Sequence, residues 1–141
     1  MTQITLDQAQ TIIDTTLAEG HKMGLKPLSV VVLDAGGHVI AFAREDDASP
    51  GRFAIAHGKA YGAVMLGMPG SAQMKRAEDQ AYFMAAVNGV YGGQVIPVPG
   101  GVLVTEGETV IGAVGVTGDT SDNDAEAGLA GIAAAGLTGQ A

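Results

Sequence analysis

Two segments of this sequence share one plan, in which a run of β-forming residues, a glycine-containing turn and a second such run follow one another. The first segment is Leu28–Arg44, with Gly36 and Gly37 at its turn, and the second is Gly101–Val116, with Gly107 between two glutamates. Glycine supplies the positive φ angle that a tight turn between antiparallel strands requires. The sequence therefore predicts two β-hairpins, and their strands frame any binding site.

Four helical segments surround these hairpins. Thr5 and Gln8 have the spacing of a capping box, so the first helix is predicted to begin after Thr5 and to end at Gly24. Further helices are expected over residues 53–66, from residue 71 onward and over residues 122–135. The one from residue 71 is either continuous or in two pieces, because residues 88–89 carry a stop signal. The resulting order α-ββ-α-α-ββ-α indicates an α/β (α+β) sandwich in which helices cover a sheet. The last six residues are expected to fray.

Composition limits the class of protein. The chain has 141 residues, which fits a single domain over 1–141, and 47% of them are hydrophobic, which is enough for a core. The net charge of −8 and the seven scattered basic residues argue against binding to nucleic acid or to anionic membranes. The lack of cysteine excludes disulfides, thiolate metal sites and a cysteine nucleophile. Since the sequence shows neither a signal peptide nor a membrane span, a cytoplasmic location is expected.

Five short motifs become informative when they are taken together and in order. They are Val31–His38, Ala56–Ala63, Leu66–Pro69, Pro99–Val102 and Ile111–Gly118. In combination they cover nearly the whole chain and resemble the GlcG/HbpS-like family, also called the haem-degrading or DUF336 domain. Relatives of that family include the C-terminal domain of PduO-type cobalamin adenosyltransferases.

The resemblance implies a profilin-like sandwich with a five-stranded antiparallel sheet, and the remaining short strand must then come from Gly93–Val98. It also implies a homo-oligomer, which is a dimer or assembles further into tetramers or octamers. Some members of the family bind haem, a few degrade it or sense redox state, and many lie beside genes for the catabolism of small organic acids. Because one fold hosts several chemistries, the resemblance alone does not fix the function.

Three histidines are available as nitrogen ligands for a haem iron. His21 lies near the end of the first helix, His57 lies one turn before Tyr61 in the second helix, and His38 lies at the first hairpin turn. His21 and His57 are both candidates for the axial ligand, and Tyr61 is a candidate contact for the bound molecule. The resemblance favours His21, since a first-helix histidine is implicated in haem-binding relatives. Each histidine also has a structural interpretation: a cation at a helix end, a packed side chain and a solvated turn residue, respectively.

Basic side chains are the expected partners of haem propionates or of the carboxylate of a small acid. Arg44, Arg52 and Lys59 are the candidates. Lys59 follows small apolar residues, so its ammonium group is expected either to lose its charge or to pair with a carboxylate. Asp34 ends the first strand, where it either forms a bridge to Arg44 or accepts from the amide of Gly36 as in an Asx-turn.

Two backbone segments are candidate anion sites. Gly100 and Gly101, stiffened by nearby prolines, present amides that can hold a carboxylate, or else they only start a strand beneath a closely packed helix. Thr117 and Gly118 precede a helix N-terminus and offer a second such place. We expect both to converge on one pocket with the second helix.

Acidic residues cluster at the start of the last helix. Part of their spacing is similar to a calcium loop, but the glycine and the final glutamate of that loop are missing. Helix capping and metal binding both remain open for this cluster. Its members are Asp119, Asp122, Asp124 and Glu126.

Three hypotheses of function follow. The first is a homo-oligomeric protein that binds haem or another tetrapyrrole. The second is an enzyme that acts on a small organic acid or carbonyl compound at a subunit interface, with Lys59 as acid/base, Arg44 as clamp and the amides of Gly100 and Gly101 as oxyanion donors. The third is a regulatory or structural accessory of a catabolic operon, with no chemistry of its own.

Overall fold

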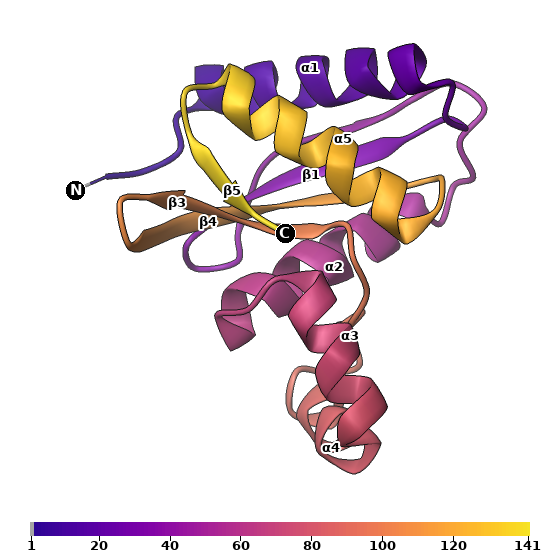
Figure 1. Ribbon diagram of the computed structural model, residues 1–141, viewed down its shortest axis with the longest axis vertical. Coiled ribbons are helices and arrows are strands. Elements are labelled where there is room, and N and C mark those ends of the chain that lie inside the picture. Colours follow the sequence, from indigo (N-terminus) through magenta and orange to yellow (C-terminus); the bar gives the residue numbers. More distant parts are fainter. Residues whose placement is uncertain (1) are drawn as a thin grey trace.

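The computed structural model describes residues 2–141 and shows a twisted sheet with helices on both faces (Figure 1). The sheet is antiparallel throughout and has the strand order β2-β1-β4-β3-β5, so the two predicted hairpins lie side by side within it. Helices α1 and α5 cover one face, α2 covers the other, and α3 and α4 project away from the body. The strands are Ser29–Asp34 (β1), Val39–Arg44 (β2), Gly101–Glu106 (β3), Thr109–Thr117 (β4) and Thr138–Gln140 (β5). The helices are Leu6–Met23 (α1), Arg52–Leu66 (α2), Gly70–Asp79 (α3), Ala81–Val90 (α4) and Ser121–Ala134 (α5).

The ends of α1 confirm the local sequence signals. The hydroxyl of Thr5 accepts from the amide of Gln8 at 3.0 Å, and the side chain of Gln8 accepts in return from the amide of Thr5 at 3.0 Å. Gly24 terminates the helix in the left-handed region with a φ of 71°. Both ends are therefore set by residues that satisfy backbone groups which the helix itself leaves unpaired.

The strand β1 separates two apolar cores. Val30 and Val32 face the core beneath α1 and α5, whereas Val31 and Leu33 face the core beneath α2. Successive side chains of a strand point to opposite faces, so a strand that is apolar at every position is buried on both sides. None of the helices in residues 2–141 combines the length and hydrophobicity needed to cross a bilayer.

The helix α2 lies unusually close to the sheet because glycines face it. A side chain at Gly115 would collide with the carbonyl group of Ala56, and one at Gly101 would collide with the carbonyl group of Lys59. The helix presents its own small residues to the same contact, including Ala60. This close approach fixes the position of α2 against β3 and β4, and with it the positions of the side chains on the outer face of the helix.

The predicted source of the fifth strand was wrong. It is β5, formed by residues expected to fray, which pairs with the otherwise open edge of β3. Gly139 lets this strand pass under the side chains of Leu129 and Ile132. The segment Gly93–Val98 instead lies along α2 as a loop, where the amide of Ile96 donates to the carbonyl of residue 58 at 3.2 Å.

The third helix also differs from the prediction. It begins at Gly70 with Pro69 at the N-cap and breaks at Gln80, where φ is −140° and ψ is 64°. The expected stop at residues 88–89 lies inside the last turn of α4. The break turns α4 so that the guanidinium of Arg76 lies 4.2 Å from the ring centre of Phe83, a contact that the sequence does not signal.

The close packing of α2 predicts the effect of a single methyl group. We expect Gly115→Ala to lower the free energy of unfolding by about 1–3 kcal/mol, because the added methyl group forces α2 to move away from β4. Gly89→Ala is the matched control, since a side chain there meets nothing within 4 Å. Urea unfolding of both variants measures the difference, and equal stabilities would contradict the packing described here.

Candidate functional site

One end of the sheet gathers most of the residues that the sequence singled out. Arg44 of β2 lies beside Ser29 of β1, which lies beside Thr117 of β4. Helix α2 begins over this row, where Nη1 of Arg52 donates to Oγ1 of Thr117 at 2.8 Å. The glycines at residues 100–101 enter the adjacent strand, and the backbone of the second lies against Lys59. Gly100, Gly101 and Thr117 therefore lie beside the second helix, whereas their convergence on one pocket stays a prediction.

Lys59 is buried among these residues and is bonded within the protein. Its Nζ donates to Oδ2 of Asp124 at 3.1 Å and to the carbonyl oxygen of Val116 at 3.0 Å. A side chain at Gly100 would come within 2.9 Å of the same Nζ, and the φ of this glycine is 109°. The glycine thus makes room for the lysine. Lys59 is only 3% exposed, which disfavours a role in proton transfer to a bound molecule.

Burial dominates the ionisation of the Lys59–Asp124 pair. It lowers the pKa of Lys59 and raises the pKa of Asp124, although each group draws the other toward its charged form. Each partner therefore bears a desolvation cost that its counter-charge only partly offsets. The pair connects α2, β4 and α5, and its position in the interior gives it a structural role.

Among the other acidic residues near the start of α5, Asp119 is held by three hydrogen bonds. The carboxylate of Asp119 accepts from Nδ2 of Asn123 at 2.9 Å and from the amides of Lys26 and Thr120 at 3.0 and 2.8 Å. These bonds lower the pKa of Asp119 to about 2. No group of three potential metal ligands occurs within residues 2–141, and Asp119 supports the start of α5 beside Thr120, whose hydroxyl caps the helix by accepting from the amide of Asn123. Gly118 has a φ of 143° and lies against the carbonyl of residue 27, so its role is also in packing.

Asp34 lies at the other end of the first hairpin. Its Oδ1 accepts from the amides of Gly36 and His38 at 2.9 Å each, as in an Asx-turn, and lies 3.2 Å from Nδ1 of His38. Burial acts to raise the pKa of Asp34, but these bonds outweigh it and hold the pKa below its ordinary value. The alternative bridge to Arg44 was wrong, because antiparallel pairing places Arg44 opposite Ser29, at the far end of the strands.

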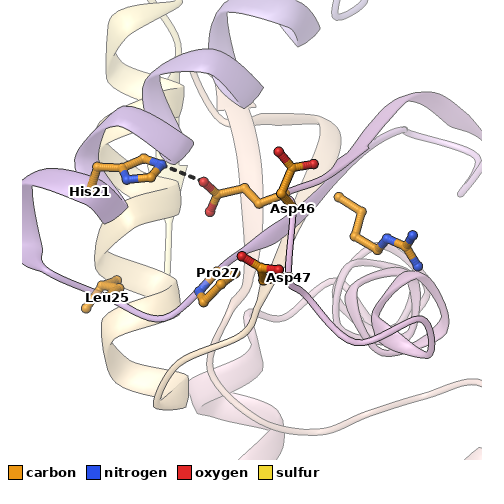
Figure 2. Close-up of a pocket in the computed structure, with 7 residues that line it drawn as sticks. His21, Leu25, Pro27, Asp46 and Asp47 are labelled. Atoms are coloured by element: carbon orange, nitrogen blue, oxygen red, sulfur yellow. Dashed lines mark hydrogen bonds and ion pairs between the residues drawn. The ribbon is translucent and has the colours of Figure 1, made fainter.

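A cavity of about 510 Å³ opens between the end of α1 and the segment after β2, and His21 lines it (Figure 2). Nε2 of His21 lies 2.6 Å from Oε2 of Glu45, whose other oxygen accepts from the amide of Leu28 at 2.7 Å. The side chain of His21 is 75% exposed, and Asp46 and Asp47 line the same cavity from the segment after β2. Arg44 also lines this cavity. Three acidic residues line it as well, Glu45, Asp46 and Asp47, and their negative charge disfavours a bound molecule that carries carboxylates.

A row of rings lies on the outer face of α2. Phe42 contacts Phe53 at a centroid distance of 4.8 Å, Phe53 lies 5.8 Å from His57, and His57 stacks on Tyr61 at 5.3 Å. Tyr91, at the end of α4, meets Tyr61 edge-on at 6.0 Å. The three α2 rings are spaced by four residues, a helical period that could have revealed the row from the sequence. The sequence gives no comparable signal that Phe42 and Tyr91 join this row.

His57 is half-buried within this row and lines a cavity of about 390 Å³ between the start of α2 and the loop of residues 93–96. Burial lowers the pKa of His57 below its ordinary value of 6.5, so its imidazole is neutral at pH 7. No protein group within residues 2–141 forms a hydrogen bond with this ring, whereas His21 and His38 each have a carboxylate partner. A neutral imidazole nitrogen that is free of protein partners is available as an axial ligand for a haem iron.

Comparison with known proteins identifies relatives of this chain. A family model described as haem degrading protein HbpS-like matches residues 4–133. The crystal structure of an HbpS double mutant from Streptomyces reticuli is 28% identical, with a TM-score of 0.80 over 94% of this chain and 87% of that one. No curated protein matches the sequence.

Two further solved structures share the fold. Protein ORFY of Klebsiella pneumoniae, from the DUF336 family, is 24% identical, with a TM-score of 0.87 over 96% of this chain and 93% of that one. A PduOC–haem complex is 18% identical, with a TM-score of 0.87 over 99% of this chain and all of that one. At these identities the likeness establishes the architecture, and the predicted five-stranded sandwich is confirmed.

The buried pair predicts a non-additive response to substitution. We expect Lys59→Met alone to cost about 3–5 kcal/mol of stability, because it leaves the carboxylate of Asp124 buried without its counter-charge. Lys59→Met combined with Asp124→Asn should regain most of this loss, since the amide oxygen can still accept from the backbone of Asp119. Urea unfolding of the single and double variants measures the coupling. A double variant less stable than the single one would contradict this account.

Proposed function

This chain belongs to the HbpS-like family of haem degrading proteins, and we propose that it binds haem on the outer face of α2, with His57 facing the iron. The observation that carries the proposal is the half-buried, neutral imidazole of His57 between the rings of Phe53 and Tyr61. A porphyrin is a flat apolar ring with iron at its centre, so an aromatic row interrupted by one nitrogen ligand complements it.

The residues around the row of rings also suit the macrocycle and the propionates of haem. The adjoining cavity exposes more apolar than polar surface, which suits the macrocycle. Arg52 precedes Phe53 directly, and Arg44 lies two residues after Phe42 on the same face of β2, so both arginines belong to segments at one end of the row. We assign these arginines to the propionates. When bound, haem supplies redox-active iron, which both haem degradation and redox sensing require.

His57 is the better candidate than His21 on three grounds. His21 is mostly exposed, is already bonded to Glu45 and lies in an acidic cavity. His57 has none of these features. The alternative of an enzyme acting on a small acid loses its acid/base group, because Lys59 is committed to Asp124 in the interior.

Hemin titration tests the proposal directly. The wild-type protein should give a shifted Soret band, and His57→Phe should weaken hemin binding at least about tenfold, which corresponds to about 1.4 kcal/mol. This variant keeps an aromatic ring in the row but removes the nitrogen ligand. His38→Phe is the matched control, since His38 lies on an exposed turn and should bind as the wild type does. A loss of the band in His21→Phe with no change in His57→Phe would assign the iron to the other histidine.

The lowered pKa of His57 predicts a pH dependence. A histidine whose folded pKa lies below its unfolded value of 6.5 contributes stability that is present above pH 6.5 and is lost as the pH falls through the folded pKa. We therefore expect both hemin affinity and the free energy of unfolding to decline between about pH 7 and about pH 5, since protonation removes the ligand and charges a half-buried ring. For stability, His57→Gln should be less pH-dependent than the wild type in this window. Parallel stability profiles for the two proteins would show that His57 is not the titrating group.

A further inference from the structure

Two arginines at one end of the sheet have no acidic partner. The ion pairs within residues 2–141 are made by histidines and lysines, and neither Arg44 nor Arg52 takes part in one. The chain has fifteen acidic and seven basic residues, so carboxylates outnumber cations, yet these two guanidinium groups have no carboxylate of their own. A guanidinium without an internal counter-charge is available to an anion from solution.

The register of the sheet places both arginines beside a buried hydroxyl. Ser29 of β1 pairs with Arg44 on one side and with Thr117 on the other, and directly opposed residues of antiparallel strands turn their side chains to the same face. That face is the one that α2 covers, because Val31, two residues along β1 from Ser29, lies in the core beneath this helix. Arg52 reaches the same place from α2 through its bond to Thr117. We call Ser29, Arg44, Arg52 and Thr117 the arginine cluster.

The hydroxyl of Ser29 is buried without a hydrogen-bond partner. Ser29 is 0% exposed, and its Oγ neither donates to nor accepts from any group within residues 2–141. A buried polar atom normally has a partner, because leaving it unpaired gives up the hydrogen bonds that water would supply. Since this hydroxyl belongs to the same cluster as the two arginines, an anion bound there gains a third donor. The unpaired hydroxyl is therefore independent evidence for a ligand.

The guanidinium of Arg52 is positioned by the protein and still has donors to offer. Its Nε donates to Oγ of Ser49 at 3.2 Å and its Nη1 donates to Oγ1 of Thr117 at 2.8 Å, whereas its Nη2 has no acceptor within residues 2–141. Each terminal nitrogen carries two hydrogens, so both keep a hydrogen for a further acceptor. A planar set of donors of this kind matches the two oxygens of a carboxylate.

The start of α2 adds positive potential at the same place. Gly51 occupies the N-cap without a side chain to accept from the first amides, and the first turn holds no acidic residue. The N-terminal end of a helix attracts negative charge. The charge of Arg52 also extends to Lys59, whose pKa is lowered chiefly by burial and further by this arginine. Negative charge bound at Arg52 therefore relieves an excess of positive charge.

We propose that the arginine cluster binds the carboxylate of a small organic acid and that the hydroxyl of Ser29 donates a hydrogen bond to it. Arg44 is exposed and Arg52 is partly exposed, so the acid enters from their side, and their long side chains move apart to admit it to the hydroxyl. Residues 45–47 are all acidic and follow Arg44, so a singly charged carboxylate is favoured over a dianion such as phosphate. A haem propionate carries the same group, so acid and haem compete for the cluster; this competition rests on the proposed function.

Acetate is the probe, and the measurement is the rise of the thermal unfolding midpoint with acetate concentration, at an ionic strength held constant with sodium chloride. Acetate should stabilise the wild type in a saturable way. Ser29→Ala should bind acetate at least about tenfold more weakly, because a hydrogen bond to a charged group is lost. Without acetate this variant should be as stable as the wild type, since the hydroxyl has no partner to lose. A Ser29→Ala variant that loses stability but keeps its acetate affinity would overturn the proposal.

Two control variants separate binding at the cluster from general effects. Thr16→Val removes another buried hydroxyl without a partner, on α1, and should bind acetate as the wild type does. Arg44→Gln should weaken acetate binding about two- to fivefold, as expected for an exposed ion pair. Lys75→Gln removes one positive charge from α3 and should have no effect. Equal weakening in Arg44→Gln and Lys75→Gln, or a wild type that acetate does not stabilise, would contradict the proposed site.

Competition with hemin separates this inference from the proposed function. Acetate should weaken hemin binding by the wild type and leave the binding of hemin dimethyl ester, which has no free carboxylate, unchanged. Acetate that binds without weakening hemin binding would overturn the shared use of the cluster. A wild type that binds acetate but not hemin would instead refute the proposed function and support the carboxylate site.

Discussion

The rest of the molecule depends on how closely α2 lies against the sheet. Gly101 and Gly115 leave no side chain between their strands and the helix backbone. At this separation Lys59 cannot reach solvent, so its ammonium turns into the interior and finds Asp124 and a β4 carbonyl. Burying two charges costs about as much as their attraction returns, so the pair adds orientation more than stability. The pair holds α5 and α2 at the same end of β4. The position of the rings on the outer face of α2 is fixed with the helix.

The outer face of α2 follows from its inner face. Because small residues fill the contact with the sheet, the bulky residues of the helix project outward at a spacing of four, as Phe53, His57 and Tyr61. Phe42 at the edge of the sheet and Tyr91 at the end of α4 then close the row. His57 is half-buried because these rings cover it, and that cover keeps its imidazole neutral. The chemistry on the outside of the helix therefore depends on glycines beneath it.

What the sequence predicts well is local. The capping box Thr5–Gln8 and the glycine turns of the hairpins are satisfied within a few residues, so neighbours suffice to read them. The strand Thr138–Gln140 has no such signal and exists because β3 offers it an open edge. The partner of the buried lysine, Asp124, lies 65 residues away and could be expected only as a carboxylate of unknown position. The mistaken bridge between Asp34 and Arg44 came from neglecting that antiparallel strands place such residues at opposite ends.

The loop of residues 93–98 connects α2 with α4. The amide of Ile96 donates to a carbonyl of α2, and the amide of Val95 donates to the side chain of Asn88 in α4, so both helices hold this loop in place. Residues of the loop line the cavity beside His57. The haem site that we propose at His57 therefore depends on both helices and on the loop between them.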